Sequence, residues 1–128
     1  MKLKTILFVI ICTMWLVACD STRETISTIE IQELINFEEE KPDTLQLISD
    51  MKDIKIIEKI FKNAREFGEV DNQIVPQYKI KLSDGEYYLW IDHTKTGTIA
   101  NIKSRNMFYN IRASEEFKEA INYKNKNK

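Results

Sequence analysis

Apolar and polar residues alternate most regularly over residues 78–91, YKIKLSDGEYYLWI, and this pattern predicts a β-hairpin. Asp84-Gly85 divides the run into two halves and is a dipeptide that favours a two-residue hairpin loop. With that loop, the pairs on one face are apolar and predict a core face: Leu82–Tyr87, Ile80–Leu89 and Tyr78–Ile91. The pairs on the other face combine lysines with aromatic rings: Lys81–Tyr88 and Lys79–Trp90.

Between about 50 and 66 the apolar residues recur every three to four positions, which predicts an amphipathic helix. Ile54, Ile57 and Phe61 fall on one side of this helix, and charged residues, lysine above all, cover the other side. Asp50 is suited to the N-cap, where its side chain can accept a backbone N–H. Phe67-Gly68 is a plausible end of the helix.

Shorter patterns predict the remaining elements. Residues 25–31, 44–48, 98–103 and 107–111 are typical of strands, while the acidic run at 38–40 with Pro42 and the segment HTKTG (93–97) are typical of a loop and a turn. Ser114 caps a last helix. The sequence therefore predicts an α+β domain, with a mainly antiparallel sheet of about four to six strands and two helices packed on one face.

An unbroken apolar run opens the chain. Residues 6–17 contain one polar residue, Thr13, and follow a start that carries Lys2 and Lys4. A helix needs about 20 apolar residues to span a bilayer, whereas this shorter run has the length of a signal-peptide core. The pattern predicts a signal peptide over residues 1–18.

The segment Leu16-Val17-Ala18-Cys19 resembles the lipobox of bacterial lipoproteins. The resemblance implies cleavage between Ala18 and Cys19 and a thioether-linked diacylglycerol on Cys19, with acyl chains such as palmitate. Two acyl chains on one residue are enough for stable anchoring. We therefore expect an extracytoplasmic protein that is lipid-anchored to the cell membrane. The alternatives are a plain membrane helix and a cleaved signal with a chance cysteine.

Removal of the signal peptide defines the expected organisation of the mature chain. Residues 19–24 are a lipidated tether, 25–123 a single α+β domain and 124–128 a frayed tail. The 19 basic residues lose Lys2 and Lys4, which leaves 17 against 20 acidic residues and a net charge of −3. This balance argues against nucleic acid as a partner, and it makes the protein a poor match for an anionic membrane surface, so the lipid must provide the anchoring.

Four features in the same order are similar to the YhfM-like lipoproteins of Gram-positive, spore-forming bacteria. These are the lipobox, the D-x-K-D-I-x-x-I-x-K-I helix at 50–60, the Y-Y-L-W-I strand at 87–91 and the F-Y-N-I-R-A-S segment at 108–114. The resemblance implies a small surface lipoprotein of unestablished biochemical role. It carries no catalytic residues over to this chain.

Few residues are candidates for catalysis or for binding a metal ion or a cofactor. The single histidine, His93, is predicted in a turn, and Ser83, Ser104 and Ser114 lack the strand–turn–helix setting of a nucleophile. The folded part has no cysteine, because Cys12 leaves with the signal peptide and Cys19 is lipidated. Three scattered glycines do not form a phosphate loop. We expect no enzyme, no metal site and no cofactor.

The second face of the hairpin is the most suggestive feature for binding. Tyr88, Trp90, Lys79 and Lys81 either complete the fold under loops and lysine stems, or form an interaction face that stays open to a partner. The leading hypothesis is a non-catalytic lipoprotein that binds or assists another envelope protein. The alternative is a module that binds cell-wall glycan or a small solute, with Tyr88 and Trp90 as stacking platforms.

Overall fold

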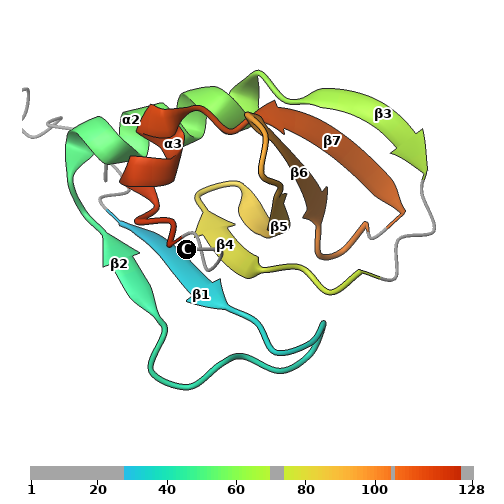
Figure 1. Ribbon diagram of the computed structural model, residues 1–128, viewed down its shortest axis with the longest axis horizontal. Coiled ribbons are helices and arrows are strands. Elements are labelled where there is room, and N and C mark those ends of the chain that lie inside the picture. The colour runs from blue at the N-terminus through green and yellow to red at the C-terminus, as the bar shows by residue number, and fades with distance from the viewer. Residues whose placement is uncertain (1–27, 70–73, 105, 125–128) are drawn as a thin grey trace, which may run out of the picture.

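The computed structural model of the protein describes residues 28–69, 74–104 and 106–124. The predicted signal peptide, Cys19, the tether, the start of the first predicted strand and the last four residues lie outside the described residues. The elements follow one another as β1 (Ile29–Glu33), β2 (Gln46–Ile48), α2 (Met51–Lys62), β3 (Arg65–Glu69), β4 (Tyr78–Leu82), β5 (Gly85–Ile91), β6 (Thr96–Asn101), β7 (Met107–Arg112) and α3 (Glu115–Ala120) (Figure 1).

The strands form one sheet in the order β2-β1-β4-β5-β6-β7-β3, and every neighbouring pair is antiparallel. This confirms the predicted α+β class. The sheet has seven described strands, which is more than expected, because residues that the sequence pattern assigned to the end of a helix form a strand instead.

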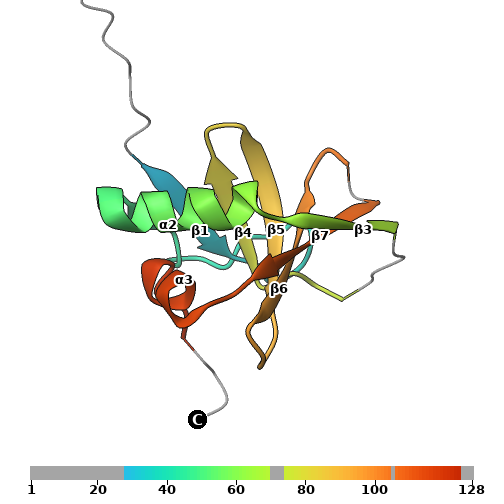
Figure 2. The ribbon, with the colours of Figure 1, turned by 90° about the horizontal axis from the view of Figure 1, so that it is seen from above.

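One face of the sheet and both helices enclose the core. Alternation along β4 and β5 places Ile80 and Leu89 on this face, where both are fully buried. Ile54 and Ile57 of α2 and Phe117 of α3 pack into the same cluster. The two helices therefore lie side by side on one face, as predicted (Figures 1 and 2).

Both helices begin where their caps were expected. The Asp50 carboxylate accepts the backbone N–H of Lys52 at 2.8 Å, and the Ser114 hydroxyl accepts that of Phe117 at 3.2 Å. These bonds satisfy donors that the first turn of a helix leaves unpaired.

The predicted end of α2 was wrong. The helix ends at Lys62 with Asn63 as its C-cap, and the chain then extends into β3, which pairs with β7. Gly68 does not stop the helix but adopts φ 103° at a β-bulge, where the register shifts between Glu66 and Gly68.

The hairpin has the predicted faces but a different register. Its loop is Ser83-Asp84, and Leu82 pairs with Gly85 rather than with Tyr87. The pairing is displaced by two residues, which returns every side chain to the face expected of it. Gly85 has φ 154°, a backbone conformation that other residues rarely adopt, so the glycine serves as the first residue of β5 instead of a loop position.

The turn before β6 is also shorter than predicted, because Thr96 and Gly97 already belong to the strand. A Cβ added to Gly97 would approach Ile111 Cγ1 to 3.0 Å and the Trp90 carbonyl oxygen to 3.1 Å. The glycine thus permits close packing inside the sheet. Within the described part of the chain, no helix is long and apolar enough to cross a membrane.

Candidate functional site

A continuous row of five aromatic rings crosses the face of the sheet opposite the helices. Successive ring centroids lie 5.5, 6.1, 5.7 and 6.0 Å apart along this aromatic row, which runs Phe37, Tyr88, Trp90, Phe108, Phe67. Tyr88 and Trp90 come from β5, and Phe108 and Phe67 from β7 and β3. The row therefore links the centre of the sheet to its β3 edge.

Loops bury the first half of the aromatic row. Tyr88 is 3% exposed, and its hydroxyl donates a hydrogen bond to the Phe37 carbonyl oxygen at 2.9 Å. Phe37 packs edge-on against the Tyr88 ring. This half of the row stabilises the fold by covering the second face of the sheet.

The covering loop, residues 34–45, is held by a buried amide. Gln32 Nε2 donates to the Lys41 carbonyl oxygen at 2.7 Å and to Thr44 Oγ1 at 2.6 Å. Lys79 forms an ion pair with Glu40 across the same loop. The acidic run therefore forms a loop, as predicted, and one of its carboxylates secures it to β4.

The second half of the row reaches the surface. Trp90 is partly exposed, and its Nε1 donates to the Ile74 carbonyl oxygen at 2.9 Å. Phe67 is 45% exposed, Ile74 70% and Val75 40%. We call Phe67, Ile74, Val75 and Trp90 the apolar rim. Phe108 links Phe67 to Trp90, and the carbonyl oxygen of Ile74 accepts the Trp90 hydrogen bond. Exposed apolar side chains gathered in one region are typical of contact surfaces.

The four residues predicted as an interaction face do not form one open surface. Tyr88 is buried, and Lys79 lies opposite it in the ladder and pairs with Glu40. Lys81 is exposed, opposite Glu30 on one side and Glu86 on the other. Only Trp90 joins the apolar rim.

The sequence analysis missed the other rim residues. Phe67 was assigned to the end of a helix, and it faces Phe108 only because β3 pairs with β7. Ile74-Val75 carried a signal that could have been used, namely two apolar residues that precede Pro76 and follow the polar segment 71–73.

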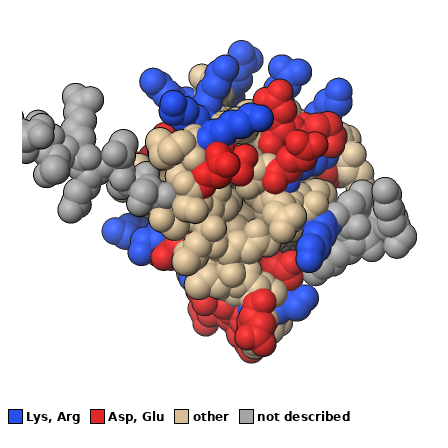
Figure 3. Space-filling view, turned by 90° about the vertical axis from the view of Figure 1, so that its left-hand side faces the viewer, with Lys and Arg blue, Asp and Glu red and all other residues tan. Residues whose placement is uncertain are grey.

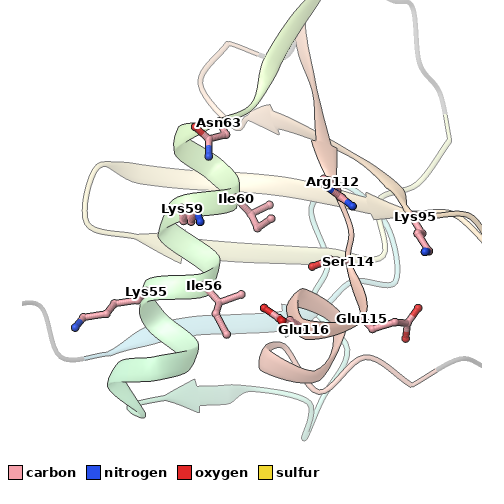
Figure 4. Close-up of a pocket in the computed structure, with 10 residues that line it drawn as sticks. All are labelled: Lys55, Ile56, Lys59, Ile60, Asn63, Lys95, Arg112, Ser114, Glu115 and Glu116. Atoms are coloured by element: carbon pink, nitrogen blue, oxygen red, sulfur yellow. The ribbon is translucent and has the colours of Figure 1, made fainter.

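A separate groove of about 680 Å³ lies between α2 and the start of α3. Ile56 and Ile60 of α2 point into it toward Ser114 and Glu116, whereas Lys55 points away (Figure 4). Arg112 and Lys59 also line it. The groove thus combines an apolar wall with groups of both charges.

The remaining candidates for chemistry lie apart from one another in the fold. His93 is exposed in the turn between β5 and β6, and the Ser114 hydroxyl serves as a helix cap. Ser83 and Ser104 lie in the turns that follow β4 and β6. Among the described residues, no group of three or more His, Cys, Asp or Glu side chains is arranged to hold a metal ion.

Comparison with known proteins returns no relative: no protein-family model, curated protein or solved structure matches the chain.

Proposed function

We propose that the protein is an extracytoplasmic lipoprotein, anchored to the cell membrane through Cys19, that binds another envelope protein through the apolar rim. The role is non-catalytic and requires no cofactor. The partly exposed end of the aromatic row is the observation that supports the binding role. The L-V-A-C segment supports the anchor, and the similarity to YhfM-like lipoproteins is consistent with both.

The apolar rim has the composition of a binding hot spot. Aromatic side chains are enriched in the centres of protein interfaces, and tryptophan is prominent among the residues that carry most of the binding energy. Trp90 is held in place by Phe108 on one side and by its hydrogen bond to Ile74 on the other. A fixed ring loses little conformational entropy when a partner covers it, which favours affinity.

Cross-linking in cells tests the binding role. The lipidated protein is cross-linked, purified by affinity and analysed by mass spectrometry, alongside Ile74→Asp and Leu47→Asp. Leu47 is the matched control because it is 62% exposed and apolar but belongs to β2, at the opposite edge of the sheet. We expect a saturable envelope protein with the native chain and with Leu47→Asp, and its loss with Ile74→Asp. Equal recovery with both variants would refute the role of the rim.

The groove between α2 and α3 supports a second candidate function, the binding of a small solute or cell-wall glycan. Its apolar wall and its groups of both charges could hold the ring and the polar groups of such a ligand. Isothermal titration calorimetry with muropeptides tests this candidate, and Ile56→Ser is the variant expected to abolish binding. Trp90 fluorescence reports a glycan at the rim instead, because Trp15 leaves with the signal peptide and Trp90 is then the only tryptophan.

A further inference from the structure

The lysines of α2 form a single outward face. At 100° per residue, Lys52, Lys55, Lys59 and Lys62 fall within an arc of roughly 80°, whose centre lies about 150° from the centre of the side that carries Ile54 and Ile57. All four lysines are exposed. The helix rises about 1.5 Å per residue, so the four ammonium groups are spread along roughly 15 Å. We call these four residues the lysine face.

Carboxylates flank the lysine face without neutralising it. Asp53 and Glu58 lie on the sides of α2, and Glu116 of α3 projects toward the groove rather than outward (Figure 4). Among the described residues, no ion pair joins any of the four lysines to a carboxylate. Their charge is therefore available to an external anionic surface.

Charged side chains are unevenly distributed over the domain. Basic side chains gather along the top of Figure 3, where α2 runs, next to an acidic patch at the upper right, and a second group of mainly acidic side chains lies at the bottom. The loop between β1 and β2, which carries Glu38, Glu39, Glu40 and Asp43, lies at the bottom of Figure 1, far from α2. The net charge of −3 does not describe this distribution, because an anionic surface would attract the lysines of α2 and repel the acidic loop.

The chain enters the domain close to the lysine face. Ile29 of β1 pairs with Ile48 of β2, and Ile48 precedes the N-cap of α2 by two residues. Nine residue steps separate Cys19 from Thr28. A chain of that length reaches at most roughly 30 Å, which keeps α2 within reach of the membrane that holds Cys19.

We propose that the lysine face of α2 lies against the anionic lipid headgroups of the membrane that anchors the protein. The inference rests on the proposed function, since it requires the lipid on Cys19. The lipid retains the protein, and the lysine face sets its orientation. The acidic loop and the side of the sheet opposite α2, which carries the aromatic row, then point away from the bilayer.

Lysine footprinting of the full lipidated chain tests the orientation. The protein is isolated from membranes, inserted into preformed vesicles and treated with an amine-reactive reagent, and labelling at each lysine is read by mass spectrometry. One set of vesicles is phosphatidylcholine, and the other adds phosphatidylglycerol. We expect the lysine face to be labelled severalfold more slowly on the anionic vesicles only. Lys81 and Lys103, which are exposed elsewhere, should react equally on both.

A charge-matched pair of variants strengthens the test. Lys55→Gln/Lys59→Gln should remove most of the protection of Lys52 and Lys62, because each lysine near an anionic surface strengthens the attraction about fivefold. Lys81→Gln/Lys103→Gln removes the same charge and should leave the protection intact. About 1 M salt should also abolish protection, since it shortens the Debye length to about 3 Å.

Two outcomes distinguish a wrong orientation from a missing lipid anchor, on which the orientation depends. A vesicle-bound protein whose lysine face reacts equally on both lipids would overturn the orientation and leave the anchor standing. A protein that lacks the mass of a diacylglycerol and does not float with the vesicles would overturn the anchor, and the proposed orientation with it.

Discussion

Replacing Ile57 by alanine tests the packing of α2 on the sheet, and the neighbouring Ile56 provides a matched control. Ile57 is 0% exposed, whereas Ile56 is partly exposed on the wall of the groove. Removing a fully buried isoleucine to alanine costs about 2–5 kcal/mol, because hydrophobic transfer energy is lost and a cavity remains. Both substitutions gain the same few tenths of a kcal/mol in helix propensity, so this gain cancels in the comparison.

The expected losses differ enough to be measured. A domain of this size is stable by about 5–15 kcal/mol, and we expect Ile57→Ala to remove about 3 kcal/mol, against about 1 kcal/mol or less for Ile56→Ala. Each kcal/mol corresponds to about 4–8 °C in Tm, so Ile57→Ala should melt about 12–24 °C below the native protein.

Urea unfolding followed by Trp90 fluorescence measures both losses, since Trp90 lies on the opposite face of the sheet from α2 and touches neither substitution. The slope of unfolding free energy against urea should stay constant. Equal losses for the two variants, or a larger loss for Ile56→Ala, would refute the assignment of the buried face of α2.

Three further predictions follow from single contacts. Gln32→Leu removes the amide that donates to the Lys41 carbonyl oxygen and to Thr44 Oγ1, and leaves only the Thr44 hydroxyl as a donor to that carbonyl. It should lower the free energy of unfolding by about 1–3 kcal/mol in urea denaturation. Gly97→Ala should cost about 1–3 kcal/mol in the same assay, because its Cβ would meet Ile111 at 3.0 Å; an unchanged midpoint would contradict this close approach. Burial, with the Glu33 carboxylate and a second tyrosine nearby, raises the pKa of Tyr78 from 10.0 to about 12. Folding therefore favours the neutral phenol, and the stability that Tyr78 contributes below pH 10 should be lost as the pH rises from about 10 to 12. Ultraviolet titration should show a late-ionising phenol that disappears in Tyr78→Phe.

Elements with local signals could be predicted from the sequence. Asp50 and Ser114 mark the two helix starts because a cap acts on backbone groups two or three residues away. The faces of the hairpin follow from alternation, which a displacement of two residues leaves unchanged.

Features that depend on distant residues could not be predicted. Arg65–Glu69 is a strand only because β7, far along the chain, supplies its hydrogen-bond partners. The burial of Tyr88 likewise depends on Phe37 and on the loop that Gln32 holds. The candidate rim could not be predicted for the same reason, since three strands and a loop must meet before Phe108 can link Phe67 to Trp90 and Ile74 can accept the Trp90 hydrogen bond.

The two edge strands of the sheet affect whether copies of the protein can aggregate by pairing their strands. β2 contributes only three residues to one edge, and the bulge at Gly68 interrupts the other edge in β3. Short and irregular edges offer a poor template for strands of another molecule. Lipid anchoring would confine many copies to two dimensions, where a long regular edge would promote polymerisation into fibrils. With such anchoring, the irregularities of β2 and β3 would allow dense display on a surface without aggregation.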